Sequence, residues 1–258
     1  MRNINFRFIA LVVFLFCVFL TFKGYKAYKA SLITPTPTPT VETQKKVTLL
    51  EGWRVEEMAE KLNKELGIKN EDFLKIAKEG YMFPDTYFFD QDASASAVAS
   101  KLRATFDLKY DADLQTKIKN AGLTPSEGVI LASIVEREAR SSEARRMVAS
   151  ILLKRLRIDM GLNVDASIQY ALGYQTQEKS WWKRHLTKND LKVNSPYNSY
   201  IHAGLPPTPI CNPSLSSLEA VANADLKTPY LYYSHDLEGV PHYAKTLEEH
   251  NQNVANYL

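Results

Sequence analysis

The apolar and polar positions of the chain fall into successive patterns, and the first is an uncharged apolar run. Residues 8–22 read FIALVVFLFCVFLTF, and basic residues flank the run on both sides. A membrane-spanning helix needs about 20 residues, and residues 24–28 extend the run toward that length. No pattern of small residues typical of signal-peptide cleavage follows it. We therefore expect a retained, single-pass transmembrane helix as an N-terminal membrane anchor over residues 1–30.

A segment rich in proline and threonine follows the apolar run. Residues 34–40 read TPTPTPT. Alternating proline without glycine favours an extended polyproline II spacer over a flexible coil. We expect a Pro/Thr-rich linker over residues 31–46, which would hold the rest of the chain away from the membrane.

Regular patterning begins at residue 47. Residues 47–50 predict a short strand, residues 51–53 a turn and residues 70–78 a helix. Between the turn and this helix, apolar side chains at helical spacing predict another helix that stops at Gly67. These side chains are Val55, Met58, Ala59, Leu62 and Leu66. The order strand, turn, helix, helix is that of a LysM-like fold, which is associated with polymers of N-acetylglucosamine, although many small α+β units share it.

Aromatic residues dominate the next stretch. Residues 79–89 read EGYMFPDTYFF, which predicts a pair of strands broken by proline. We expect these aromatic side chains to pack in a core rather than to contact sugars. A helix capped by Ser94 is predicted over residues 94–108. With a boundary near residues 110–115, the chain divides into a small LysM-like subdomain (47–110) and a larger α+β domain (111–258).

The strongest helix signal lies at residues 124–138. Thr124 is placed as the cap, Pro125 occupies the first helical position, and Glu127 completes a capping box. Residues 128–135 carry no charge on any side of the helix. A helix of this kind is buried all round.

Two carboxylates end this helix and point to opposite sides of it. At about 100° per residue, Glu138 shares the face of the bulky apolar side chains, whereas Glu136 lies above small side chains that leave room for a ligand. A carboxyl group at the end of a desolvated helix is suited to general acid catalysis. The alternative is that both glutamates form salt bridges with Arg137, Arg140 or Arg145.

Composition excludes several classes of function. Lys+Arg 32 and Asp+Glu 29 are interspersed, so the formal net charge of +3 does not form the basic stripe of a nucleic-acid binder. Cys17 lies in the apolar run and is not placed to pair with Cys211, and the five histidines have no metal-binding spacing. No serine-hydrolase elbow or phosphate-binding glycine loop occurs. We expect no metal, no cofactor and no nucleic-acid partner.

From residue 47 onward the motifs of the chain resemble those of a known family. The octapeptide ASIVEREA at residues 132–139 contains Glu136, and further motifs of that family occur in the same order. They are EGWRVEEMAEKL (51–62) and EGYMFPDTYFF (79–89) before it, then YALG (170–173), SPYNSY (195–200), GLPP (204–207) and KTLEEHN (245–251). The sequence is therefore similar to the endolytic murein (peptidoglycan) lytic transglycosylases, the MltG or YceG-like family.

This resemblance implies a function and its residues. In the family the first glutamate of the octapeptide is catalytic, which assigns the general acid/base role to Glu136. Asp165, Asn198 and Tyr200 become the candidates for binding the substrate. The implied reaction cleaves the bond between N-acetylmuramic acid and N-acetylglucosamine in nascent glycan strands of peptidoglycan and leaves a 1,6-anhydro-muramyl end. The implied setting is the cytoplasmic membrane, with the catalytic domain extracytoplasmic and peptidoglycan synthases as candidate partners.

Alternatives stay open for several residues. Asp165 could cap a helix, Asn198 could form a turn, and Tyr200 could pack in the core. Trp181 and Trp182 are suited either to stacking on sugar rings or to burial at an interface.

The chain also departs from the family motifs. Lys154, Ala166 and Thr208 stand where the family usually has other residues, and we expect these positions to touch the substrate groove. One rival function is a water-using muramidase with Asp165 as its second carboxylate. Another is a non-catalytic, peptidoglycan-binding membrane anchor, which the departures favour and the retained Glu136 opposes.

Overall fold

The computed structural model describes Lys23 and Gln44–Leu258. Apart from Lys23, the predicted membrane anchor lies outside the described residues, and so does the predicted linker up to residue 43. Across Lys23 and residues 44–258, no helix is long and apolar enough to cross a membrane. Helices and two small antiparallel sheets together make up residues 44–258, which confirms the predicted α+β class.

The first sheet joins two strands that are far apart in sequence. Strands β1 (Lys45–Thr48) and β2 (Thr86–Phe89) pair antiparallel, with Val47 opposite Tyr87. Strand β1 begins and ends earlier than the strand predicted at 47–50, because its pairing extends over the whole of β2. Val47 and Tyr87 are both buried, so this face of the sheet contributes to the core.

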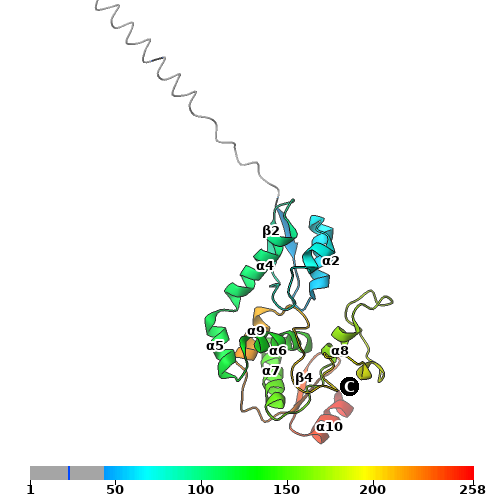
Figure 1. Cartoon of the computed structure of the whole chain (residues 1–258). Helices are drawn as coiled ribbons and strands as arrows, with labels where there is room; N and C mark the ends of the chain where they lie inside the picture. Colours follow the sequence, from blue (N-terminus) through cyan, green and yellow to red (C-terminus); the bar gives the residue numbers. More distant parts are fainter. Residues whose placement is uncertain (1–22, 24–43) are drawn as a thin grey trace, which may run out of the picture. The chain divides into compact units, whose positions relative to one another are not determined.

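The helices after β1 follow the predicted pattern closely. Helix α2 (Val55–Leu66) ends at Gly67, whose φ of 71° is the left-handed conformation that favours glycine at a helix stop. Figure 1 shows α2 beside the first sheet. Helix α3 (Asn70–Leu74) is shorter than the predicted 70–78, and Phe73 is the one buried residue of this helix. The LysM-like character of this part and its boundary stay predictions.

The aromatic stretch at residues 79–89 forms one strand rather than the predicted pair. Its first half is a loop, in which the Met82 N–H donates to the side-chain oxygen of Asn212 at 2.9 Å. Pro84 has no N–H with which to extend a strand ladder. The predicted core packing is confirmed for Tyr81, Phe83, Tyr87 and Phe89, which are buried, but not for Phe88, which is 52% exposed.

Helix α6 (Pro125–Glu138) is the centre of the helical part. The predicted capping box is present: Thr124 Oγ1 accepts from the Glu127 N–H at 3.2 Å, and Glu127 Oε2 accepts from the Thr124 N–H at 2.7 Å. Every residue from 128 to 135 is buried, as predicted. The helices packed on α6 are α5 (Ala112–Asn120), α7 (Ser142–Arg157) and α9 (Leu215–Ala222). Before them runs α4 (Ala95–Lys109), capped by Ser94 as predicted (Figure 1).

The C-terminal part adds the second sheet. Strands β3 (Tyr232–His235) and β4 (Pro241–Ala244) pair antiparallel, and helix α10 (Leu247–Tyr257) packs against both of them. Helix α8 (Asp165–Leu172) packs on α6, and a short 3₁₀ helix, η1 (Asp190–Lys192), packs on α8.

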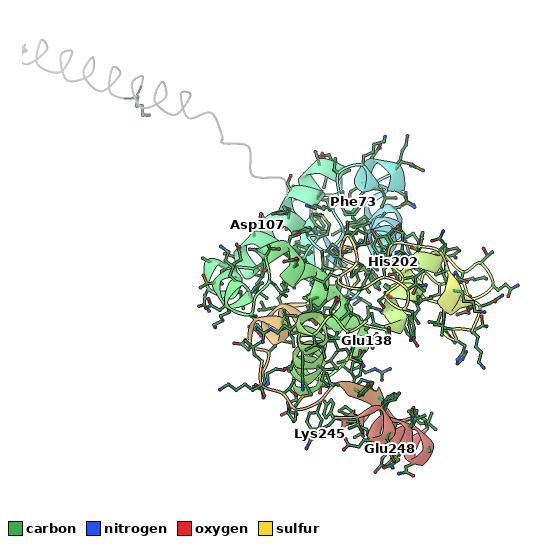
Figure 2. All side chains as sticks on the ribbon, turned by 60° about the horizontal axis from the view of Figure 1, so that its bottom comes forward. Phe73, Asp107, Glu138, His202, Lys245 and Glu248 are labelled. Atoms are coloured by element: carbon green, nitrogen blue, oxygen red, sulfur yellow. The ribbon has the colours of Figure 1, made fainter. Side chains whose placement is uncertain are left out.

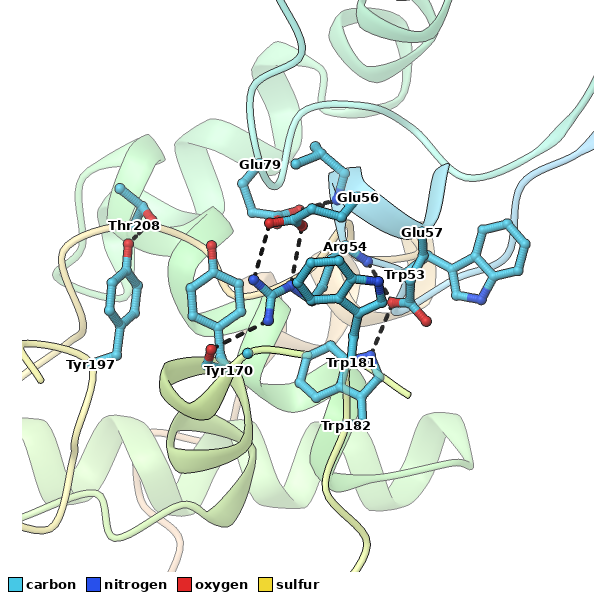
Figure 3. A network of polar contacts seen from close by, with 12 residues as sticks. Trp53, Arg54, Glu56, Glu57, Glu79, Tyr170, Trp181, Trp182, Tyr197 and Thr208 are labelled. Atoms are coloured by element: carbon cyan, nitrogen blue, oxygen red, sulfur yellow. Dashed lines mark hydrogen bonds and ion pairs between the residues drawn. The ribbon is translucent and has the colours of Figure 1, made fainter. Parts of the chain in front are cut away.

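The two neighbouring tryptophans are attached to helix α2. Trp182 Nε1 donates to Glu57 Oε2 at 3.0 Å (Figure 3). Trp181 Nε1 donates to Glu60 Oε1 at 3.1 Å. The Arg54 guanidinium lies 4.6 Å from the centre of the Trp181 ring. These contacts favour burial at an interface over sugar stacking, because a guanidinium group lies over each indole ring, Arg54 over Trp181 and Arg137 over Trp182.

Candidate active site

Glu136 lies in the last turn of α6, and its carboxylate accepts hydrogen bonds on both oxygens. Oε1 accepts from Arg145 Nη2 at 2.6 Å. Oε2 accepts from the Ser214 N–H at 2.8 Å, from Ser214 Oγ at 2.5 Å and from Ser217 Oγ at 2.7 Å. Only 4% of the Glu136 side chain is exposed. The predicted alternative, a salt bridge from Glu136 to one of three arginines, is therefore realised with Arg145.

The partners of Glu136 are positioned by helix starts. Ser214 caps helix α9, and Ser217 lies in the first turn of the same helix. The positive end of the α9 dipole thus faces the carboxylate. Arg145 lies in the first turn of α7, which Ser141 caps, and Arg145 Nε donates to the Ala139 carbonyl at 3.1 Å.

This set of partners can accommodate both protonation states of Glu136. A hydroxyl group rotates and can either donate or accept a hydrogen bond. Ser214 Oγ already accepts from the Ser217 N–H and from Arg145 Nη1, so the Ser217 hydroxyl is the group that can donate to the carboxylate and accept from the protonated carboxyl group. An acid/base catalyst must pass through both states in each turnover.

A polar cavity of about 650 Å³ opens beside Glu136. Its wall includes the end of α6, the start of α7 and the turn between β3 and β4, where Asp236 and Gly239 lie. A second cavity of about 450 Å³ adjoins it, and the two share Glu138 and His235 as lining residues. Both volumes lie in the usual range for ligand sites.

The open space is not where the sequence pattern placed it. The small-residue face of α6 is closed, because Ala132 and Ser133 are fully buried. Ser133 Oγ accepts from the Ile210 N–H at 3.0 Å, and Cys211 Sγ donates to the Ser133 carbonyl at 3.2 Å. Residues 210–212 therefore cover the face predicted to admit a ligand, and access to Glu136 is from the end of the helix.

Glu138 lies at the junction of the two cavities, at the end of α6 (Figure 2). The Tyr233 hydroxyl donates to Glu138 Oε2 at 3.0 Å. Burial raises the pKa of the Glu138 carboxyl to about 7, and the charge of Asp165 adds to this effect, while the bond from Tyr233 opposes it. Glu138 is thus a second titratable group in the groove, in an environment distinct from that of Glu136.

The three predicted substrate-binding residues have different positions. Asp165 and Tyr200 line the second cavity together, and the Tyr200 hydroxyl donates to Asp165 Oδ1 at 2.6 Å. Asn198 is fully buried and is not among the residues that line either cavity. Its side-chain amide donates to the Leu191 and Val193 carbonyls at 3.0 and 2.8 Å, and its oxygen accepts from the Tyr200 N–H. This is the turn-forming role considered for Asn198.

The departures from the family motifs are not among the residues that line the two cavities, although the Ala166 backbone donates a hydrogen bond to Glu138, which lines both. Lys154 Nζ donates to the Thr228 and Pro229 carbonyls at 2.9 and 3.0 Å. Thr208 Oγ1 shares a hydrogen bond of 2.7 Å with the Tyr197 hydroxyl, and Ala166 is buried. The three residues do not line either cavity at Glu136, contrary to the expectation that they touch the groove.

Sequence reasoning missed Ser214 and Ser217 as neighbours of Glu136, and it did not place the predicted turn between β1 and α2 beside Glu136. Gly52 has a φ of 73°, and a Cβ atom added to it would lie 3.5 Å from Glu136 Cγ and 3.3 Å from Arg137 Nη1. The Gly52 N–H donates to the Asn212 carbonyl at 3.0 Å, and the Asn212 N–H donates to the Trp53 carbonyl at 2.8 Å. The sequence signal of this turn is the glycine in EGWRV, which marks a left-handed turn.

A single buried carboxylate, held by hydroxyl groups beside a polar groove in an α+β unit, defines a candidate acid/base site. The chain belongs to the YceG-like family, whose sequence profile matches residues 26–256. The resemblance found in the motifs is confirmed.

Individual relatives agree with this assignment. An endolytic murein transglycosylase of Bacillus subtilis (strain 168) is 33% identical over 195 residues, which cover 74% of this chain and 52% of that protein. An endolytic murein transglycosylase of Streptococcus pneumoniae serotype 2 (strain D39 / NCTC 7466) is 34% identical over 181 residues, 70% of this chain and 32% of that protein. The chain thus spans about half of the length of the Bacillus protein and about a third of the length of the Streptococcus protein.

A solved structure shares the fold. The 2.6 Å crystal structure of a yceG-like protein from Listeria monocytogenes matches with a TM-score of 0.72 and 30% sequence identity. The match covers 80% of this chain and 75% of that one.

Proposed function

We propose that this protein is an endolytic peptidoglycan lytic transglycosylase with Glu136 as its general acid and base. The observation that carries the proposal is the position of Glu136. Its side chain is 4% exposed, borders a cavity of about 650 Å³, and has two hydroxyl partners, of which Ser217 suits either protonation state. The names of the relatives from Bacillus and Streptococcus support the substrate and the reaction class.

The proposed reaction needs one proton carrier. Protonated Glu136 donates its proton to the glycosidic oxygen, and the bond from that oxygen to C1 of N-acetylmuramic acid breaks with its electron pair on the oxygen. N-acetylglucosamine leaves with a new hydroxyl group. The C6 hydroxyl of the muramyl residue then bonds to C1, and its proton returns to Glu136. The product is a 1,6-anhydro end, and no water is consumed.

Asp165 and Tyr200 are the proposed substrate-binding pair. They line the second cavity, and the 2.6 Å bond between them orients both polar groups. Asn198 would act by holding the Tyr200 backbone through its side-chain oxygen, at 3.0 Å, rather than by contacting sugar.

The proposed setting follows from the sequence. The apolar run at residues 8–22 supports a single-pass anchor in the cytoplasmic membrane, with the catalytic part on the extracytoplasmic side. Cleavage of nascent strands in that place would set glycan length next to peptidoglycan synthases, which are the proposed partners.

The test replaces Glu136 and identifies the products. Full-length Glu136→Gln removes the transferable proton, and we expect cleavage of purified sacculi to fall at least ~100-fold. Glu138→Gln is the matched control two residues along the same helix, and it should retain most of the activity. Thermal unfolding of both variants checks that they are folded.

The mass of the products separates the rival functions. Anhydro ends, each lighter by one water than a reducing end, support the transglycosylase, whereas reducing ends support the muramidase. Strands that bind the wild type and are never cut would support the non-catalytic anchor. Full activity in Glu136→Gln would refute the role of Glu136.

A further inference from the structure

Arg145 has hydrogen-bonding capacity that its protein partners do not use. Its guanidinium donates from Nε to the Ala139 carbonyl, from Nη2 to Glu136 Oε1 and from Nη1 to Ser214 Oγ at 3.4 Å. A guanidinium group has five N–H donors in a planar fork. Within residues 44–258, these three bonds leave one N–H on each of the two terminal nitrogens without a protein acceptor.

The free donors belong to a side chain that lines the larger cavity. Arg145 borders the cavity of about 650 Å³ together with Glu136. Its side chain is only 14% exposed, so its stem and head are held against the protein. Arg137 and Arg140 line the same cavity, together with Glu136, Glu138 and Asp236, so its wall carries three guanidinium and three carboxyl groups. A partly desolvated guanidinium binds anions more strongly than an exposed one.

We propose that Arg145 binds a carboxylate of the glycan strand and so selects the muramyl residue for the position next to Glu136. This inference rests on the proposed function. A carboxylate matches the planar fork of arginine, and the contact requires no loss of the bond from Nη2 to Glu136. Of the two sugars in the strand, only N-acetylmuramic acid carries a carboxylate. It is the lactyl group in strands without peptides, or a carboxylate of the attached peptide.

The proposed cleavage requires that the muramyl residue, and not N-acetylglucosamine, is selected for the position next to Glu136. Only the muramyl residue next to Glu136 becomes the 1,6-anhydro product, so the strand must bind in one of its two possible sugar registers. In one register the muramyl carboxylate forms a charged hydrogen bond with Arg145. In the other register N-acetylglucosamine, which has no carboxylate, takes that position and the bond is absent. A neutral polymer of N-acetylglucosamine lacks that group in every register.

The experiment compares strands with free and with amidated carboxylates. Carbodiimide coupling to ammonia converts the carboxylates to neutral amides of similar shape. On amidated strands we expect the KM of the full-length wild type to rise about 10- to 100-fold, the range for a lost charged hydrogen bond. In Arg145→Gln the KM should already be high on free strands, and amidation should change it less than about twofold. Arg145→Lys keeps the charge without the fork and should lie between the two.

A neighbouring arginine provides the control. Arg146 lies on the same helix, is exposed, and borders a different cavity between α7 and α9. Arg146→Gln removes an equal charge and should keep the full sensitivity to amidation. Strands without peptides carry only the lactyl carboxylate, so the amidation effect on them assigns the contact to the lactyl group, and an effect confined to peptide-bearing strands assigns it to the peptide.

Two outcomes separate this inference from the function on which it rests. If the wild type and Arg145→Gln respond equally to amidation while the wild type cleaves, the inference is wrong and the function stands. Binding of both kinds of strand is measured beside cleavage. Strands bound through their carboxylates but never cut would overturn the proposed function and leave Arg145 as an anion-binding residue. If Arg145→Gln does not fold, the test rests on Arg145→Lys. Its response to amidation should be smaller than that of the wild type, and an equal response would overturn the inference.

Discussion

The close approach of Gly80 to Pro209 gives a stability prediction with a matched control. Gly80 has a φ of 84°, and a Cβ atom added to it would lie 2.4 Å from Pro209 Cγ and 3.2 Å from Val129 Cγ1. Gly67 has a similar φ of 71°, but an added Cβ atom would meet nothing within 4 Å. The two Gly→Ala substitutions therefore share their backbone strain and differ in steric overlap.

The magnitudes follow from these two contributions. The left-handed conformation costs a non-glycine residue roughly 1–2 kcal/mol, which is the full effect expected for Gly67→Ala. Overpacking against a rigid proline ring adds about 1–3 kcal/mol, so Gly80→Ala should lower the free energy of unfolding by about 2–5 kcal/mol in total. Urea unfolding of the detergent-solubilised full chain measures both, followed by the fluorescence of Trp53, Trp181 and Trp182.

A second substitution tests the cause. Pro209→Ala removes the ring atoms that the new Cβ atom would meet, so in the Gly80→Ala background it should recover part of the loss, beyond its own effect alone. Equal destabilisation by Gly80→Ala and Gly67→Ala, or no recovery with Pro209→Ala, would refute the steric argument.

Three further predictions concern single polar groups. Burial raises the pKa of Glu79 from 4.5 to about 8, so the folded state retains a proton that the unfolded state releases, and stability should fall by up to about 1.4 kcal/mol per pH unit from about pH 5 to 8. Urea unfolding of Glu79→Gln should show a flatter pH dependence, and an unchanged one contradicts this. Trp182→Phe loses the 3.0 Å bond to Glu57 but keeps a ring under Arg137, so thermal unfolding should report a loss of about 1 kcal/mol, and no loss at all would argue against the attachment to α2. Tyr200→Phe loses the 2.6 Å bond to Asp165, and kinetics on glycan strands should show kcat/KM reduced about 10-fold; an unchanged value removes Tyr200 from the proposed site.

The local signals in the sequence predicted helices α2, α4 and α6 and the start of α3, whereas α5, α7, α8, α9 and α10 were not predicted. Thr124 and Glu127 make their capping bonds within three residues of each other, and Gly67 ends α2 through its own backbone conformation. Such features depend on neighbouring residues alone. The limits of β1 were not predictable in this way, because they are set by pairing with a strand that begins at Thr86.

The candidate site was predictable only in part, for the same reason. The motif identified Glu136, and the charge pattern placed Arg145 among its possible partners. Ser214 and Ser217 lie 78 and 81 residues beyond Glu136 in sequence, and no periodicity connects them with α6. The open face of α6 was predicted wrongly, because a segment that itself shows no helical or strand pattern, residues 210–212, covers the small side chains.

The turn at Gly52 has a consequence for how such proteins can be recombined. Gly52 is bonded to Asn212 and lies against Glu136, so residues from both sides of the predicted boundary near 110 meet at the candidate site. A hybrid protein could take the residues before that boundary from one parent and the residues after it from another. Its turn at Gly52 and its Glu136 would then come from different parents and would not have been selected for each other. We expect functional hybrids to require that both sides of the boundary come from one parent.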